Sequence, residues 1–129
     1  MAPSRDDIDK YLTEVKAAIS INRYRIARNE HRSDNMELFE DYLIDEAKAK
    51  EILLSLETDD FSEVRNNDHI GFEHELLYIF GKDVKLLERY ESDDVKTVSL
   101  YIKFNKLDNS FIIVVSFHEQ KWPMNYAFK

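Results

Sequence analysis

The chain has 129 residues, no cysteine, and 26 acidic against 18 basic residues, for a formal net charge of −8. A chain of this length can bury one hydrophobic core, so we expect a single domain over residues 1–129. The lack of cysteine excludes a thiolate nucleophile, a disulfide framework and a cysteine-based zinc site. No apolar run approaches the roughly 18 residues of a membrane span, and the first ten residues lack a signal-like apolar stretch, so we expect a cytoplasmic protein without membrane contact.

The charge is unevenly distributed along the chain. Residues 34–95 carry 19 acidic and 6 basic residues, a net charge of −13. Residues 21–33 carry four arginines and one acid, and residues 96–129 carry five lysines and two acids, so each segment has a net charge of +3. A net negative charge disfavours a nucleic-acid partner, but the two basic segments can meet a phosphate if the fold brings them together.

The N-terminal half has the apolar spacing of helices. Ser4 is placed to cap a helix over residues 5–20, in which Ile8, Leu12, Val15 and Ile19 form one apolar stripe. Residues 21–26 alternate and indicate a short strand or an extended arm. Residues 35–44 predict a second helix, and Asp45 is placed to cap a third over residues 46–56.

From residue 60 the apolar spacing changes to the period of two that is typical of strands. We expect a short strand at residues 60–65 and an apolar strand at residues 74–81 that ends at Gly81. A charged loop follows at residues 85–95, and residues 97–106 and 110–118 form a β-hairpin. Helices followed by strands predict an α+β fold with a mostly antiparallel sheet.

The hairpin places polar side chains together if the more hydrophobic face of each strand is buried. We expect the buried faces to be Val98, Leu100, Ile102 and Phe104 in the first strand, and Phe111, Ile113, Val115 and Phe117 in the second. A turn at Asp108-Asn109 then pairs residue 104 with residue 113. This register sets Tyr101 opposite Ser116, Ser99 opposite His118, and Lys103 opposite Val114.

RNA cleavage without a metal ion requires a base, an acid and a cation, and this sheet face carries a phenol, an ammonium and an imidazole. The 2′-OH must lose a proton, the leaving 5′ oxygen must gain one, and the charge of the phosphorane must be stabilised. Histidine titrates near neutrality, so His118 is the candidate for proton transfer, as acid or base. Lys103 or an arginine is the candidate phosphate ligand, and Tyr101 can position or stack on a base. The simpler alternative is that this face is only covered by a helix or by solvent.

The chain also resembles the MqsR family of toxins from type II toxin–antitoxin systems. The segments that carry this resemblance are "LTEVKAAISINRYRIAR", "EILLSLETDDFSEV", "HELLYIFG" and, most specifically, the hairpin "SLYIKFNKLDNSFIIVVSFHEQK". The resemblance implies a RelE-like fold, sequence-selective cleavage of single-stranded mRNA, no cofactor, and neutralisation by a bound antitoxin, which we expect to have a helix-turn-helix DNA-binding domain.

By position, the resemblance assigns catalytic roles to four residues: Tyr101, Lys103, His118 and Glu75. RNA binding falls to Arg23, Arg25, Arg28, Arg65, Tyr78 and Lys121. Glu63 stands where the family has a lysine. Either Arg65 and the arginines of residues 23–32 replace that charge, or the activity is altered or lost. The alternative function is a non-catalytic protein-interaction module that shares the fold.

Three further segments are open to two interpretations each. His69 and His74 in "DHIGFEHE" lie among carboxylates, but their spacing matches no metal-binding pattern and Gly71 indicates a loop, so we expect no metal site. The arginine-rich segment "NRYRIARNEHR" is an RNA-contacting arm or a solvated edge strand. The tail "KWPMNYAFK" contains Trp122, Tyr126 and Phe128, which we expect to lie against the core.

Overall fold

The structure is a computed structural model, which describes residues 2–28, 32–90 and 95–129. Its elements are α1 (Arg5–Ser20), β1 (Tyr24–Ile26), α2 (Ser33–Asp41), α3 (Glu46–Leu54), the 3₁₀ turn η2 (Thr58–Asp60), β2 (Phe61–Asn66), β3 (Leu76–Leu87), β4 (Val95–Lys106) and β5 (Ile112–Glu119). The predicted α+β fold with a mostly antiparallel sheet is confirmed. Within the described ranges, no helix is long and apolar enough to cross a lipid bilayer.

The helices begin where their capping residues predict. Ser4 and Asp7 form a capping box at the start of α1, which spans the predicted residues. Asp45 accepts a hydrogen bond from the Lys48 amide at the start of α3. The helix predicted over residues 35–44 begins two residues earlier and ends three residues earlier, and α3 ends two residues before the predicted boundary.

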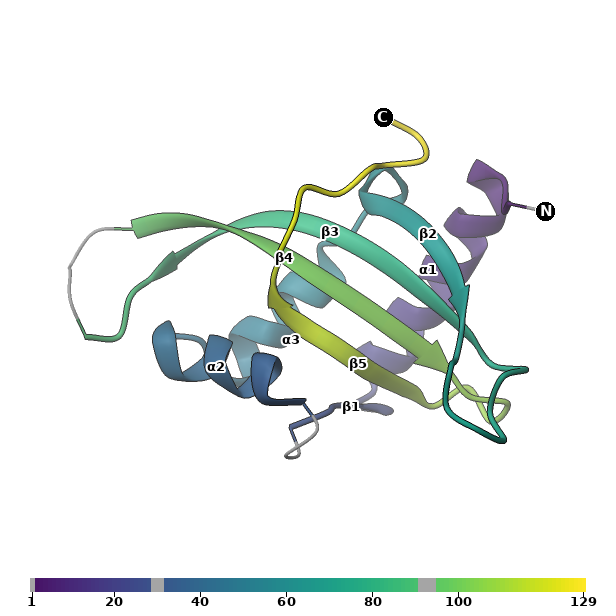
Figure 1. The fold of residues 1–129 in the computed structure, drawn as a ribbon, viewed down its shortest axis with the longest axis horizontal. Helices are drawn as coiled ribbons and strands as arrows, with labels where there is room; N and C mark the ends of the chain where they lie inside the picture. The colour runs from purple at the N-terminus through teal and green to yellow at the C-terminus, as the bar shows by residue number, and fades with distance from the viewer. Residues whose placement is uncertain (1, 29–31, 91–94) are drawn as a thin grey trace.

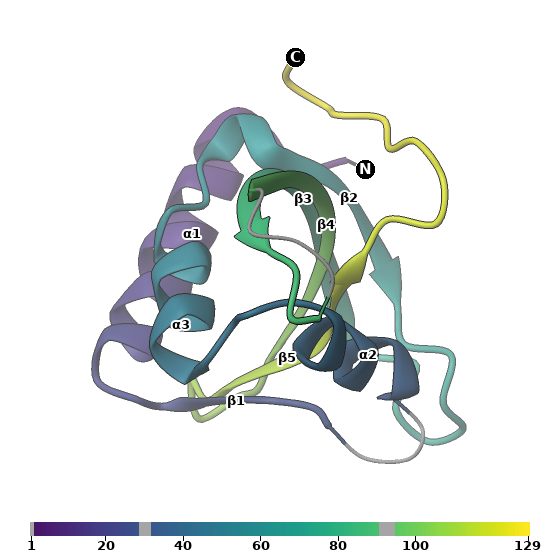
Figure 2. The ribbon, with the colours of Figure 1, turned by 90° about the vertical axis from the view of Figure 1, so that its left-hand side faces the viewer.

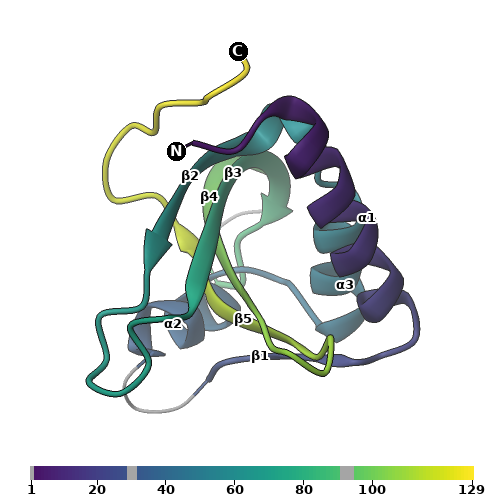
Figure 3. The same cartoon turned by 90° about the vertical axis from the view of Figure 1, so that its right-hand side faces the viewer.

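The five strands form one sheet in the order β1-β5-β4-β3-β2, in which only β1 and β5 are parallel (Figure 1). Figures 2 and 3 show α1 and α3 on one side of this sheet and the C-terminal segment on the other. The core lies on the helical side, where fully buried side chains of α1, α3 and the sheet meet: Ile8, Val15, Leu53, Phe80, Leu100, Ile102, Phe104 and Phe117. The opposite side is called the open face below.

The strand predicted to end at Gly81 continues for six more residues. β3 and β4 pair from Leu77 with Asn105 to Leu87 with Val95, so residues 85–87 are not loop as predicted. Leu86 is buried within this extension, and its apolar spacing continues the strand period. A glycine was therefore a poor indicator of the strand end. The predicted loop residues 91–94 lie outside the described residues.

The predicted hairpin register is wrong. Ser110 adopts a positive φ of 66° after the turn, which gives a three-residue loop and pairs Phe104 with Val114 instead of residue 113. Ile112 and Val114 are consequently buried, not the residues beside them. Beyond Val114 a β-bulge leaves Val115 unpaired, and from there Lys103 pairs with Ser116.

One buried side chain of α2 holds this bulge. The Asn35 amide is fully buried, and its nitrogen donates to the Val115 carbonyl at 3.1 Å and to the Ala27 carbonyl at 2.7 Å. Its oxygen accepts from the Phe117 backbone amide at 2.8 Å. Asn35 therefore binds the backbone on both sides of the position where the register changes.

Residues 120–129, called the strap below, leave β5 and cross the open face (Figure 2). The prediction that the tail lies against the core is correct for Phe128, whose ring centroid is 5.9 Å from that of Phe61. The prediction is wrong for Trp122, which is 76% exposed. Pro123 and the anchored residues on both sides keep this part of the strap away from the core.

Candidate active-site groove

A groove of about 530 Å³ lies on the open face between the sheet and the strap. The sheet and the start of α2 contribute Arg32, Ser62, Glu63, Arg65, Ile79, Tyr101, Lys103, Ser116 and His118, and the strap contributes Lys121, Trp122, Pro123, Met124 and Asn125. Four of these side chains are cationic and one is a carboxylate. The groove is thus a positively charged region in a chain whose net charge is negative.

Tyr101 and His118 are direct cross-strand partners, and both line the groove. Their ring centroids are 5.2 Å apart and the ring planes differ by 12°, so the two rings stack. The register prediction had placed Tyr101 opposite Ser116 and Ser99 opposite His118. The turn and the bulge together move the pairing by two residues, and the clustering of Tyr101, Lys103 and His118 therefore persists with a different pairing.

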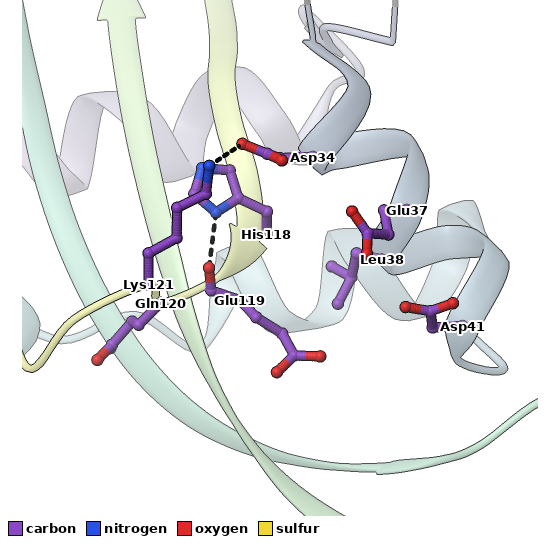
Figure 4. Close-up of a pocket in the computed structure, with 8 residues that line it drawn as sticks. All are labelled: Asp34, Glu37, Leu38, Asp41, His118, Glu119, Gln120 and Lys121. Atoms are coloured by element: carbon purple, nitrogen blue, oxygen red, sulfur yellow. Dashed lines mark hydrogen bonds and ion pairs between the residues drawn. The ribbon is translucent and has the colours of Figure 1, made fainter.

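The tautomer of His118 is set by its own strand. Nδ1 lies 2.8 Å from the carbonyl oxygen of Glu119, as Figure 4 shows, and a carbonyl can only accept a hydrogen bond. Nδ1 therefore carries a proton, and the other ring nitrogen, Nε2, has a free lone pair when the ring is neutral. This arrangement suits an imidazole that takes up a proton at Nε2 and later releases it.

Lys103 is a half-buried cation. Burial lowers the pKa of its ammonium group, and the guanidinium groups of Arg32 and Arg65 lower it further, whereas Asp68 raises it. Its nitrogen lies 5.7 Å from the centroid of the Tyr101 ring. Among the residues that the structure describes, Lys103 makes no ion pair. An anion in the groove would remove this electrostatic cost.

Tyr101 is held in its neutral form. Burial raises the pKa of the phenol; Arg65 acts in the opposite direction, and Glu63 raises it further. Arg65 Nε is 2.6 Å from Glu63 Oε1, so the only carboxylate among the groove residues named above is paired with an arginine of the same strand. The phenol remains a hydrogen-bond donor over the whole neutral pH range.

Glu75 and Tyr78 lie outside the groove, in contrast to the expectation that they share a site with Tyr101. Glu75 accepts hydrogen bonds from the side chains of Asn67 and Asn105, at 3.1 and 3.0 Å. Glu75 lies four positions before Ile79, the residue that pairs with Lys103, and four residues span about 13 Å along a strand. Tyr78 is on the helical side of the sheet, where its ring stacks on Tyr11 with centroids 3.7 Å apart.

Three of the four arginines expected to bind RNA, Arg23, Arg25 and Arg28, also lie outside the groove. Arg23 donates to the Asn109 carbonyl at 2.6 Å, and Arg28 forms an ion pair with Glu46. Arg25 pairs with Ile113, and this register places it on the open face but beyond the groove. From the same basic segment Arg32 lines the groove instead, a residue that the sequence analysis included only in the segment. Residues 29–31 of this segment lie outside the described residues.

Arg65 and Lys121, also expected to bind RNA, both line the groove. Lys121 forms an ion pair of 2.7 Å with Asp34 of α2, and this contact lowers the pKa of the Asp34 carboxyl. Apart from Lys121, the strap was not predicted to contribute to the site. Its other signal in the sequence was the cluster of aromatic residues, which was interpreted as core packing.

A second hollow, of about 260 Å³, adjoins the groove on the other side of His118 (Figure 4). Four carboxylates line this acidic hollow: Asp34, Glu37, Asp41 and Glu119. His69 and His74 lie far from it in the exposed β2–β3 loop, where Gly71 adopts a positive φ of 93°. Within the described ranges, no three side chains of histidine, aspartate or glutamate come close enough together to hold a metal ion.

Comparisons with models of known protein families, with curated proteins and with solved structures find no match for this chain.

Proposed function

We propose that this protein is a toxin-like endoribonuclease, an mRNA interferase of a type II toxin–antitoxin pair with an MqsR-type, RelE-like fold. It cleaves single-stranded RNA without a metal ion, by attack of a 2′-OH on the adjacent phosphate. The observation that carries the proposal is the half-buried ammonium of Lys103 beside the stacked Tyr101 and His118 rings. A cation with a lowered pKa, two arginines and a histidine with a free ring nitrogen favour a phosphate ligand and a proton transfer.

Each step has a residue in the groove to perform it. His118 Nε2 takes the proton of the 2′-OH as its oxygen bonds to phosphorus, and the resulting imidazolium gives this proton to the leaving 5′ oxygen as the P–O5′ bond breaks. Lys103, with Arg32 and Arg65, stabilises the charge that develops on the phosphorane oxygens. Tyr101 holds the imidazole plane by stacking and donates its O–H to the phosphate. The products are a 2′,3′-cyclic phosphate and a 5′-OH.

The first test uses purified protein, labelled single-stranded RNA and EDTA. We expect cleavage to cyclic-phosphate ends, and no cleavage where the nucleotide before the phosphate lacks its 2′-OH. His118→Ala should lower the rate by about 10²- to 10⁴-fold, as for other acid–base groups. His69→Ala is the matched control, because this histidine is exposed in the β2–β3 loop. A folded His118→Ala protein that cleaves at the wild-type rate would remove histidine from the mechanism.

The second test concerns the cellular role. Induced expression in a bacterial host should slow growth and shorten mRNA, and His118→Ala should do neither. Co-expression with a small helix-turn-helix protein encoded beside the gene should restore growth, because the proposed antitoxin binds the toxin. Wild-type protein that neither slows growth nor cuts RNA without its partner would refute the proposal.

One observation favours the alternative, a non-catalytic protein-interaction module. The acidic hollow along α2 presents Glu37 and Asp41 to solvent, and such a surface attracts a basic protein segment. A module that uses this hollow would lose its partner on Glu37→Lys/Asp41→Lys substitution, whereas Lys103→Ala, at a residue that does not line the hollow, would leave partner binding unchanged.

A further inference from the structure

The start of the strap is fixed to the end of the sheet and to α2. The Gln120 amide donates to the Ser99 carbonyl at 2.8 Å, and its side chain donates to the Leu100 carbonyl at 3.0 Å. The next residue, Lys121, forms the ion pair with Asp34 at 2.7 Å. The chain therefore leaves β5 in one direction, over the open face.

The far part of the strap is fixed to β2. Ser62 Oγ donates to the Asn125 carbonyl at 2.5 Å, and the Ala127 amide donates to the Phe61 carbonyl at 3.1 Å. Phe128 then packs on the Phe61 ring. The strap thus spans the sheet from β5 to β2 with hydrogen bonds at both ends.

The strap crosses β3 at Gly81, where its side chains lie against the strand backbone. A Cβ atom at this position would lie 2.9 Å from Met124 Sδ and closer still to Tyr126 Oη. Real Cβ atoms do not make contacts this short, so a larger residue would displace the ends of these strap side chains. The missing side chain of Gly81 therefore leaves room for the strap in the middle of a paired strand.

Trp122 is the exposed exception within this anchored strap. It lines the groove, yet it is 76% exposed, and it lies between the fixed Lys121 and Asn125. Pro123 restricts its backbone to extended conformations. The backbone of Trp122 is therefore held over the groove, and its indole makes no aromatic contact among the described residues. An aromatic ring that an anchored backbone presents to solvent at the edge of a cationic groove is typical of sites that bind bases.

We propose that Trp122 is the base-stacking platform of the groove, which selects a single-stranded nucleic acid with an unstacked base beside the bound phosphate. This inference rests on the proposed function and specifies its substrate class. Every base presents a π face, whereas the bases of a duplex already stack on one another, so the indole favours single strands without reading their sequence.

Binding to the platform can be measured without cleavage. Trp122 is the only tryptophan of the chain, so its fluorescence reports on this position alone. With a single-stranded 2′-O-methyl RNA decamer, which cannot undergo 2′-OH attack, we expect saturable quenching in the wild-type protein. The same decamer in a duplex should quench little. Trp122→Ala should weaken binding of the labelled decamer by about 5- to 150-fold in anisotropy, and Trp122→Phe should restore most of the affinity.

Phe72→Ala is the matched control, because this aromatic residue is also exposed but lies in the β2–β3 loop. It should bind the decamer with wild-type affinity. A decamer that binds without quenching, or equal affinity for the single strand and the duplex, would overturn the stacking role and leave the proposed cleavage intact. Saturable quenching without RNA cleavage would support the platform and refute the nuclease. No binding in either readout would refute both.

Discussion

Replacement of Asn35 tests whether one buried amide determines the geometry of the groove. Asn35→Ala removes three hydrogen bonds and leaves the Phe117 amide without its partner in a fully buried region. An unsatisfied buried donor costs about 1–3 kcal/mol, and the two carbonyls add to this cost, so we expect a loss of about 2–4 kcal/mol in the free energy of unfolding. For a domain of this size, the melting temperature should fall by roughly 6–20 °C.

Urea unfolding and thermal melting measure this loss, and Asn105→Ala is the matched control. Like Asn35, Asn105 is a buried asparagine, but it lies in strand β4. Among the described residues, its side chain makes a single hydrogen bond, to Glu75. Its replacement should cost about 1 kcal/mol. Because the bulge sets the pairing of Tyr101 with His118, Asn35→Ala should also lower RNA cleavage in the protein that remains folded. Equal stability losses for the two variants, with unchanged cleavage by Asn35→Ala, would refute the proposal that Asn35 holds the bulge.

Three further substitutions have expected outcomes. Lys103→Met should raise the free energy of unfolding by about 0.5–2 kcal/mol at pH 7 while weakening RNA binding, and urea unfolding and anisotropy measure the two effects. Since the folded-state pKa of Lys103 is lowered, the unfolded chain holds that proton more tightly, and the advantage of the variant should shrink as the pH rises toward 10.5. Tyr11→Phe should raise the melting temperature without altering cleavage, because the Tyr11 hydroxyl is buried and has no hydrogen-bond partner among the described residues. Gly81→Ala should displace the strap and speed tryptic cleavage after Lys121; a strap as resistant as in wild type would contradict the close crossing.

The parts of the fold that local chemistry determines were predictable from the sequence. Ser4 and Asp7 act within one helical turn, and the boundaries of α1 were predicted correctly. The hairpin turn was not, because Ser110 takes a left-handed conformation that glycine or asparagine usually occupies. Nothing in the hairpin itself indicates the bulge, since Asn35 is 80 residues from Val115 in sequence. Such contacts depend on the packing of α2 and cannot be read from periodicity.

The candidate site was predicted in part, for a physical reason. The turn moves the register by one residue and the bulge moves it by one more in the same direction. Because strand side chains alternate with a period of two, a shift of two residues returns Tyr101 and His118 to one face. Glu75 and Tyr78, by contrast, were assigned from the resemblance alone. Their positions depend on where β3 meets α1 and the β2–β3 loop, which the hairpin does not determine.

The distribution of charge around His118 limits how an RNA strand can lie on this surface. On one side is the groove with Arg32, Arg65 and Lys103, and on the other is the hollow with its four carboxylates; Lys121 lines both and is paired with Asp34. At physiological ionic strength charges are screened over about 8 Å. The charged groups on the same side of His118 as a bound phosphate therefore act on it more strongly than the net charge of the chain does. A strand that follows the groove therefore meets repulsion directly beyond His118, and we expect the reacting phosphate to be the last one bound there. The acidic remainder of the chain disfavours nonspecific contact elsewhere, so we expect the proposed RNA binding to be confined to the groove between Arg65, Trp122 and His118.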